Sequence, residues 1–401
     1  MQNNEKEMKT VMNVRNQFAR LTGLAFFLSI SFSDHGQTNN RIITGAEQIN
    51  VLMPLIQNKP VALMVNPTSV IGQTHLVDSL QRLKVNIKKI FSPEHGFRGT
   101  VEAGETVNNA TDLSTGIAVV SLYGNTKKPT PEQLADVDVV LFDIQDVGVR
   151  FFTYISSMHY LMEACAESGK KIIILDRPNP NGYYIDGPVL HMELKSFVGM
   201  HPIPIVHGLT VGELAQMING EGWLEGGKKC DLQVIAMKNY DHSKKYSLLI
   251  KPSPNLPNDH AIALYPSTCL FEGTVISLGR GTKNPFEILG NPLLKNQPFQ
   301  FKPMGIEGVA KNPLHENKIC YGIDLRTENV GSEISLRYLI KFYNEYPDKE
   351  KFFNSYFNTL AGNKTLKEQI QKGMNEEDIR DSWKKELNQY KKMRKKYLLY
   401  P

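Results

Sequence analysis

The chain has 401 residues, of which 41% are hydrophobic and 22% are charged, and its formal net charge is +5. These proportions are ordinary for a globular protein and exclude a disordered or fibrous chain. So small a positive charge at this length does not indicate a nucleic-acid partner, and a chain of this size accommodates two domains.

The N-terminal residues follow the order of a secretory signal. Basic residues between Lys9 and Arg20 precede the apolar run Leu21–Phe32, and polar residues follow from Ser33 to Gln37. The apolar run is too short to span a membrane. We therefore expect residues 1–36 to be a signal with its flank, and the protein to be exported to the periplasm or the extracellular space without stable membrane insertion.

Between residues 49 and 235 the hydrophobic pattern alternates between helices and strands. Strands are predicted over residues 61–65, 85–91, 117–122, 137–144, 171–175 and 231–235, and helices begin near residues 49, 76, 130, 154 and 210. This alternation predicts a parallel sheet with helices on both faces. The rest of the chain is expected to form a smaller α+β portion, with a strand at 319–325 and helices from Glu333, Lys349 and Asn375.

Polar segments follow four of the predicted strands, at Asn66, Glu94, Asp146 and Asp176. Because the carboxyl ends of parallel strands meet at one edge of a sheet, we expect these segments to converge there.

The most distinctive of these segments contains Glu94, His95 and Arg98 within five residues. Pro93 restricts the backbone of this loop, whereas Gly96 allows it to turn sharply. A carboxylate, an imidazole and a guanidinium on a tight loop favour a functional site. The alternative is that Glu94 pairs with Arg98 simply to hold the loop.

The sequence lacks the motifs of several common classes of enzyme. No GxGxxG follows the first strand, and Walker, GxSxG and HExxH motifs are absent from the sequence. Nucleotide cofactors, an α/β-hydrolase and a zincin are therefore not expected, and we predict no cofactor. The four cysteines show no metal spacing and are expected to be buried thiols, although export would permit one disulfide: Cys165, Cys230, Cys269 and Cys320.

Carboxylates near aromatic residues suit the hydrolysis of sugar bonds, in which one acid protonates the leaving oxygen and a second group assists at the anomeric carbon. Glu94 is the preferred acid, because burial between Pro93 and Phe97 would raise its pKa. Glu272 is the preferred distant partner, and Glu102 and Glu105 are rivals.

Two strand-end arginines, Arg150 and Arg177, suit bidentate binding of an anionic substrate group. The alternative role for each is to bond a neighbouring carboxylate, such as Asp146 or Asp176. A metal-dependent hydrolase that uses His95 with the strand-end aspartates is a further alternative.

The chain resembles the bacterial exo-β-N-acetylmuramidases. The resemblance extends from about residue 42 to the C-terminus and rests on the segments 92–96 (SPEHG), 143–150 (DIQDVGVR), 176–180 (DRPNP), 207–210 (HGLT) and 270–274 (LFEGT). It implies a Rossmann-like catalytic domain, here 42–275, then a smaller α+β domain, here 276–401. It also implies release of N-acetylmuramic acid from the non-reducing end of peptidoglycan fragments, in cell-wall turnover or recycling.

The family's candidate catalytic glutamate corresponds to Glu94, whereas Glu272 is inferred from position and chemistry. We expect substrate contacts, including an arginine on the lactyl carboxylate, from His95, Arg98, Asp146, Arg150, Tyr154, Asp176, Arg177, Asn179 and Arg280. The alternative from another class is a non-catalytic exported protein that binds muropeptides or sugars. The sequence does not indicate an oligomeric state.

Overall fold

A seven-stranded sheet, in the order β11-β8-β7-β1-β4-β6-β5, forms the centre of the computed structural model, which describes residues 41–94, 96–98, 110–124 and 126–401. Its strands are β1 (Val61–Val65), β4 (Ile87–Ser92), β5 (Ala110–Thr111), β6 (Ala118–Ser121), β7 (Val139–Asp143), β8 (Lys171–Leu175) and β11 (Asp231–Ile235). Neighbouring strands are parallel, except that β5 runs antiparallel to β6. The prediction of a parallel sheet is confirmed.

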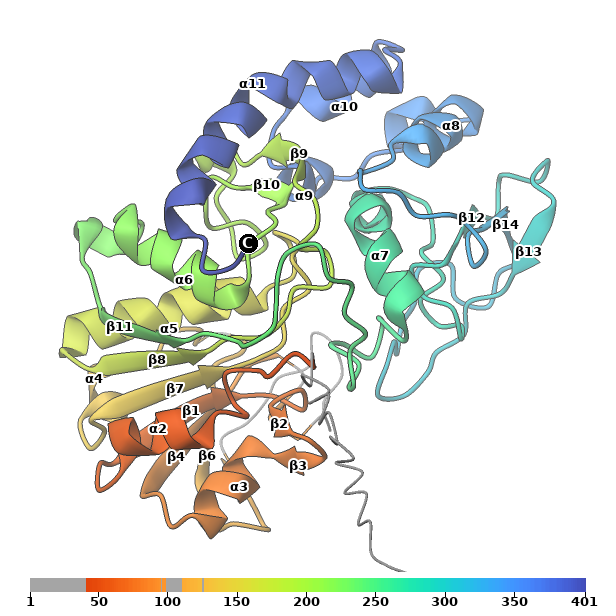
Figure 1. Ribbon diagram of the computed structural model, residues 1–401. Helices are drawn as coiled ribbons and strands as arrows, with labels where there is room; N and C mark the ends of the chain where they lie inside the picture. Colours follow the sequence, from red (N-terminus) through yellow and green to blue (C-terminus); the bar gives the residue numbers. More distant parts are fainter. Residues whose placement is uncertain (1–40, 95, 99–109, 125) are drawn as a thin grey trace, which may run out of the picture. The chain divides into compact units, whose positions relative to one another are not determined.

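Helices cover both faces of this sheet (Figure 1). Alternate strand residues point to opposite faces. Ala62 and Met64 of β1 therefore join one core, with α4 (Pro131–Leu134), α5 (Tyr154–Ser168) and α6 (Val211–Gly220). Val61 and Leu63 join the other core, with α2 (Ile49–Ile56) and α3 (Leu76–Arg82).

The strand order reverses direction at β1, which lies between β7 and β4. Segments after these strands meet at the carboxyl edge, as predicted. The Ser69 hydroxyl donates to the carbonyl of Asp143, and the Gln145 amide donates to the Thr68 hydroxyl at 3.0 Å. Such a switch point is where open α/β sheets commonly bind ligands.

The second half of the chain adds a small antiparallel sheet and several helices. The sheet has the order β12-β14-β13, from β12 (Ile288–Asn291), β13 (Phe299–Phe301) and β14 (Cys320–Asp324). The helices are α7 (Asp259–Thr268), α8 (Arg337–Glu345), α9 (Phe357–Ala361), α10 (Thr365–Gln371) and α11 (Glu376–Arg394). The remaining elements are β2 (Val70–Ile71), β3 (Thr74–His75), β9 (Asp186–Val189), β10 (Pro204–Val206) and the 3₁₀ turns η1 (Met192–Leu194), η2 (Glu225–Gly227), η3 (Cys269–Gly273), η4 (Lys349–Lys351) and η5 (Lys395–Tyr397).

The predictions for this half were only partly correct. The strand at 319–325 and the helix after Asn375 are present, and the helix expected from Glu333 begins at Arg337. The helix predicted from Lys349 is wrong, because only the short turn η4 forms there. The following Phe352 and Phe353 are buried, and Phe353 forms an isolated bridge with Thr274, which stops helical continuation.

The C-terminal residues return to the first half of the chain. Tyr390 of α11 donates a 2.6 Å hydrogen bond to the carbonyl of His207, and Tyr400 donates one of the same length to Asp176. Residues 41–401 form one compact unit by their contacts. The division into domains 42–275 and 276–401 stays a prediction.

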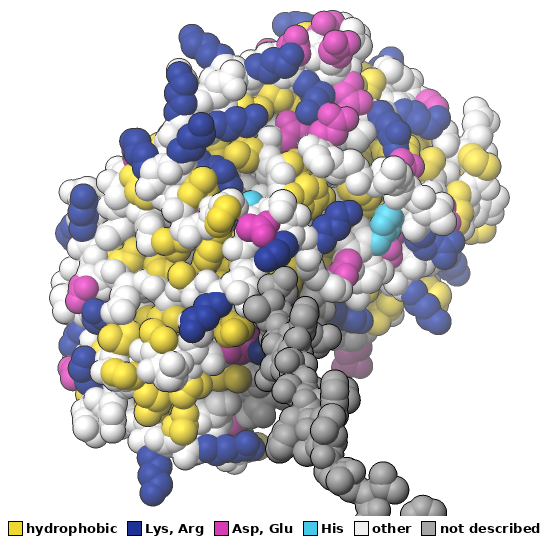
Figure 2. Space-filling model, viewed as in Figure 1, with side chains coloured by type: hydrophobic (Ala, Val, Ile, Leu, Met, Phe, Trp, Pro, Cys, Tyr) yellow, Lys and Arg dark blue, Asp and Glu magenta, His cyan; other side chains and the backbone are white. Residues whose placement is uncertain are grey.

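One face of α11 is buried through Ile379, Trp383, Leu387 and Tyr390. Its lysines lie on the exposed side, and Figure 2 shows basic side chains along the course of α11 with acidic ones among them. Pairs such as Lys384–Asp381 and Lys396–Glu221 fit a solvated surface.

The predicted signal, residues 1–36, lies outside the described residues. Within the residues that are described, no helix combines the length and apolar character needed to cross a membrane. The four cysteines are buried and free, as expected.

Candidate functional site

The carboxylate of Glu94 lies just beyond the end of β4 and accepts hydrogen bonds at both oxygens. The Tyr123 hydroxyl donates to Oε1 at 2.9 Å, and the Thr153 hydroxyl donates to Oε2 at 3.2 Å. The Tyr154 hydroxyl donates to the backbone carbonyl of Glu94 at 3.3 Å. The carboxyl group is therefore held in one orientation by residues that follow β6 and precede α5.

A row of aromatic rings extends from this carboxylate into the second half of the chain. Phe152 makes edge contacts with Tyr154 and with Tyr265 of α7, at centroid distances of 5.1 and 6.2 Å. Tyr265 in turn contacts Phe286 at 5.0 Å. These rings are buried, so they form a fixed apolar wall.

Glu272 lies in η3, directly after α7, and is bound by Arg280. The guanidinium of Arg280 also lies over the ring of Phe286, with 5.1 Å to the centroid. Both side chains keep partial exposure, 26% for Glu272 and 34% for Arg280. The two glutamates are thus placed along one aromatic wall, Glu94 beside Tyr154 and Glu272 beyond Tyr265.

Tyr356, which the sequence did not single out, belongs to a segment that Asn354 hydrogen-bonds to Glu272. Burial raises the pKa of its hydroxyl, and the negative charges of Glu272 and Glu94 raise it further. The ring contacts from Tyr154 through Phe152 and Tyr265 to Phe286 link the segment of the predicted acid with that of its predicted partner, 178 positions apart in sequence.

Arg98 does not pair with Glu94, which corrects the simpler alternative for this loop. It binds Asp112 through two nitrogens at 2.9 Å and binds Asp78 at 2.9 Å. These hydrogen bonds hold the pKa of the Asp112 carboxyl well below its usual range. Two carboxylates already saturate this guanidinium, so the structure gives Arg98 a loop-fixing role. His95 lies outside the described residues, as do Glu102 and Glu105.

Arg150 is fully enclosed and bonds carbonyl oxygens instead of the carboxylates considered above. It donates to Pro188, Ile203, Leu360 and Ala361 at 2.8–3.0 Å. Burial lowers the pKa of its guanidinium. Because these carbonyls come from the β9–β10 hairpin and the end of α9, Arg150 joins distant parts of the fold.

Arg177 binds Asp143 through Nε at 2.5 Å and Nη2 at 2.8 Å, and not Asp176. Asp176 instead accepts hydrogen bonds from Tyr400, Thr210 and the amide of Gly212. Burial raises the pKa of Asp176 to about 6. Both predicted substrate contacts are occupied by the protein itself.

Asp146 and Asn179 also serve the loops that carry them. Asp146 accepts from the Gly148 amide at 2.7 Å, and Asn179 donates to the Leu209 carbonyl at 2.8 Å. A Cβ on Gly148 would meet the Asn179 side chain at 2.1 Å, and the φ of Gly148 is +75°, so only glycine fits there. These unusual motifs therefore encode loop geometry at the edge of the sheet.

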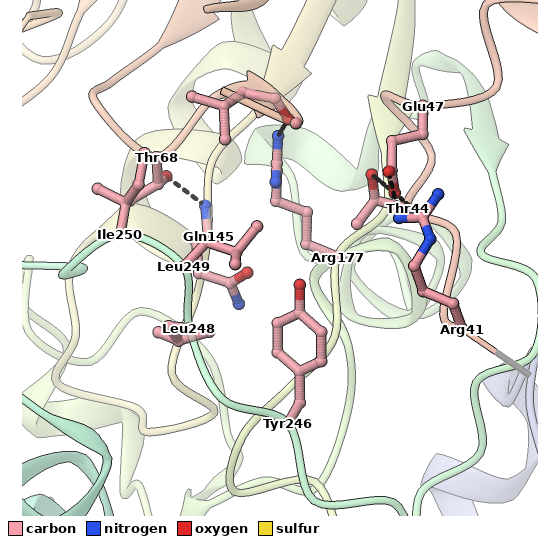
Figure 3. Close-up of a pocket in the computed structure, with 12 residues that line it drawn as sticks. Arg41, Thr44, Glu47, Thr68, Gln145, Arg177, Tyr246, Leu248, Leu249 and Ile250 are labelled. Atoms are coloured by element: carbon pink, nitrogen blue, oxygen red, sulfur yellow. Dashed lines mark hydrogen bonds and ion pairs between the residues drawn. The ribbon is translucent and has the colours of Figure 1, made fainter. Parts of the chain in front are cut away.

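A separate pocket lies at the switch point between β1 and β7 (Figure 3). Thr68, Gln145 and Arg177 line it from the sheet edge, and the hydroxyl of Tyr246 points into it toward Arg177. The arginines in this pocket are neutralised, Arg41 by Glu47 and Arg177 by Asp143. Neither arginine among the described lining residues is left without a carboxylate partner.

The strand-end aspartates do not share a common centre. In the part of the chain that the structure describes, the acidic group with metal-compatible spacing is Glu163, Glu167 and Glu225, whose ligand atoms lie within 4.8 Å of one another. Lys128 already binds Glu163 and Glu167 there, at 2.9 and 3.0 Å. This arrangement offers no support for the metal-dependent alternative at the aspartates.

Thr153, Asn354 and Tyr356 join the candidate site through their hydrogen bonds, and the sequence had not singled them out. Thr153 immediately precedes the helix predicted to begin at Tyr154. It therefore follows the polar segment at Asp146 closely, and this position in the sequence could have marked it as a candidate. Asn354 and Tyr356 reach the site only through contacts with residues more than 80 positions away, and no local pattern marks them.

Comparison with known proteins places these residues in a wider context. The family models for the N-terminal and C-terminal parts of exo-β-N-acetylmuramidase NamZ match residues 61–260 and 263–400. The chain is 38% identical over 418 residues to the peptidoglycan β-N-acetylmuramidase NamZ of Bacillus subtilis (strain 168), covering 96% of this chain and 99% of that protein.

Two solved structures of DUF1343 family proteins from Bacteroides fragilis NCTC 9343 are also similar. One is 46% identical with a TM-score of 0.83, and the other is 33% identical with a TM-score of 0.78. Each alignment covers 90% of this chain and 99% of the solved chain.

Proposed function

Because the chain belongs to the exo-β-N-acetylmuramidase NamZ family, we propose that it is a glycoside hydrolase that releases N-acetylmuramic acid from the non-reducing end of peptidoglycan fragments. One observation carries the proposal. The two family models together match residues 61–260 and 263–400, and Glu94 and Glu272 lie within them.

In this mechanism Glu94 donates a proton to the glycosidic oxygen. Its two hydrogen bonds, from Tyr123 and Thr153, orient the carboxyl group before the substrate binds. Glu272, or the acetamido group of the substrate, assists at the anomeric carbon as positive charge develops there.

Arg280 is the arginine best suited to the lactyl carboxylate of the sugar. Arg98, Arg150 and Arg177 are each saturated by protein acceptors, whereas Arg280 has one carboxylate partner, Glu272, and is 34% exposed. A guanidinium retains donors for a second carboxylate after binding one.

The test is incubation with the β-1,4 disaccharide of N-acetylmuramic acid and N-acetylglucosamine, with and without a chelator, followed by mass spectrometry. Wild type and Glu328→Gln should release free N-acetylmuramic acid, and Glu94→Gln should not. Glu328 is a suitable control because its carboxylate is bound by Arg337 and Tyr338.

Cleavage by Glu94→Gln within a few fold of wild type would refute the role of Glu94. Stoichiometric binding of folded wild type without cleavage would favour a sugar-binding protein. Loss of cleavage in the chelator would favour a metal-dependent hydrolase.

We also propose that the protein is exported to the periplasm or extracellular space and acts in cell-wall recycling. The basic, apolar and polar order of residues 9–37 supports export. Expression in cells followed by fractionation and intact mass measurement should give a shortened, exported form. Phe26→Arg combined with Phe27→Arg should keep the full-length chain inside the cell, and export of that variant would contradict the proposal.

A further inference from the structure

The segment that carries Tyr356 is fastened to the segment that carries Glu272. Asn354 donates its backbone amide to the Gly273 carbonyl at 2.9 Å and its side-chain amide to the Glu272 carbonyl at 3.0 Å. The Tyr356 amide donates to the Asn354 side chain at 2.9 Å. Asn354 therefore fixes Tyr356 relative to Glu272.

The packing beneath this segment leaves little freedom to shift. A Cβ on Gly273 would lie 2.4 Å from the Cα of Phe357, so η3 and the start of α9 touch backbone to backbone. Phe353 and Phe357 are buried on either side, whereas Tyr356 is 38% exposed. A large exposed ring on a rigid support is the arrangement that a binding site needs.

The Tyr356 hydroxyl is protonated at working pH, because burial and the nearby carboxylates raise its pKa. It has no hydrogen-bond partner among the described residues. A protonated phenol can donate one hydrogen bond, and here that donor remains available on the segment that Asn354 fastens to Glu272.

We propose that Tyr356 contacts the substrate and donates a hydrogen bond from its hydroxyl to the acetamido carbonyl oxygen of the sugar that lies between Glu94 and Glu272. This inference rests on the proposed muramidase function and extends it to substrate selection. It makes Tyr356 a residue that recognises the 2-acetamido group.

The charge of the site identifies the acetamido group rather than the lactyl group as the partner. Arg280, the cation paired with Glu272, is the better partner for the lactyl carboxylate. The phenol of Tyr356 carries no charge, so its hydroxyl suits a neutral acceptor. The acetamido carbonyl oxygen is such an acceptor.

The experiment compares wild type, Tyr356→Phe and Tyr338→Phe on the 4-nitrophenyl β-glycoside of N-acetylmuramic acid. Tyr338 is the matched control because its hydroxyl also lies near a carboxylate, that of Glu328. Tyr356→Phe should lower kcat/KM about 10- to 100-fold, the loss expected for one hydrogen bond at a reacting group. Tyr338→Phe should match wild type, and all three should share one Tm.

A second substrate tests whether the acetamido carbonyl oxygen is the acceptor of the hydrogen bond from Tyr356. In the N-trifluoroacetyl analogue the carbonyl is a poor acceptor, so the ratio of wild type to Tyr356→Phe should fall toward one. Equal rates of wild type and Tyr356→Phe on the N-acetyl substrate would overturn the inference. A ratio that persists on the trifluoroacetyl substrate would also overturn it.

Calorimetric binding of free N-acetylmuramic acid separates this inference from the proposed reaction. If wild type binds the sugar without cleaving the glycoside, weaker binding by Tyr356→Phe still supports the contact, and equal binding refutes it. If wild type cleaves and Tyr356→Phe equals it, only the inference fails. If wild type neither cleaves nor binds, both fail.

Discussion

The hydroxyl of Tyr123 lies 2.9 Å from Oε1 of Glu94 and donates a hydrogen bond to it. The two residues follow neighbouring parallel strands, β4 and β6, so the sheet itself sets this distance. The orientation of the proposed acid therefore depends on a residue 29 positions away in the sequence.

Tyr123→Phe should lower kcat about 10-fold, because it removes a hydrogen bond, which contributes ~0.5–1.5 kcal/mol, that orients the carboxyl group of the proposed acid. Steady-state kinetics on the disaccharide checks this. Tyr160→Phe, at a tyrosine that stacks on Phe197, is the control and should be unaffected. Unchanged kcat in Tyr123→Phe would show that Glu94 is oriented by other groups.

Arg150→Met should reduce the free energy of unfolding by about 3 kcal/mol, since it leaves four buried carbonyl acceptors without their donor. Urea denaturation measures the change. The matched control is Arg326→Met, at an exposed arginine bound to Asp324, where a change of about 0.5 kcal/mol or less is expected. Equal effects of the two substitutions would contradict the joining role of Arg150.

Gly273→Ala should destabilise the protein by about 2 kcal/mol and lower activity, because the added methyl group would meet the Phe357 backbone at 2.4 Å. The displacement would separate Tyr356 from Glu272. Gly331→Ala is the control, because nothing lies within 4 Å of its added methyl group. Thermal unfolding and kinetics on both variants test the contact, and wild-type behaviour of Gly273→Ala would disprove it.

Acid should destabilise the protein through two buried histidines, His159 and His201, whose rings are joined by a 3.0 Å hydrogen bond. Burial lowers the pKa of His159 to about 4 and holds the pKa of His201 well below its usual range. The unfolded chain takes up protons near pH 6.5, and the folded chain does not. Stability is therefore undiminished above about pH 6.5 and falls as the pH drops toward 4.

Between these pH values, each of the two histidines lowers the free energy of unfolding by up to about 1.4 kcal/mol per pH unit. Urea unfolding at several pH values measures it. His159→Gln combined with His201→Gln should flatten the slope, whereas His191→Gln, at a partly exposed histidine, should leave it unchanged. An identical slope in the double variant and wild type would assign the acid sensitivity to other groups.

The sequence alone was sufficient for the six parallel strands, the helices that cover them and the convergence of the strand-end segments, but not for the antiparallel edge strand β5. The strands at Val61–Val65 and Lys171–Leu175 were predicted at their observed bounds, because a buried parallel strand is a short apolar run between polar turns. Glu94 was chosen as the candidate acid for the same reason. Its loop comes directly after such a strand. In a parallel sheet, all loops that come after strands lie at the same edge, so the position of this loop can be predicted from the order of the elements.

Only the tertiary structure decided which partners the charged residues take. Arg98 binds Asp112, Arg177 binds Asp143, and Arg150 binds four carbonyls, although sequence proximity suggested other carboxylates for all three. The approach of Tyr356 to Glu272 likewise depends on Asn354, 82 positions away. Hydrophobic periodicity is local and can be read along the chain, whereas hydrogen-bond partners are selected by distances that exist only after the elements have packed.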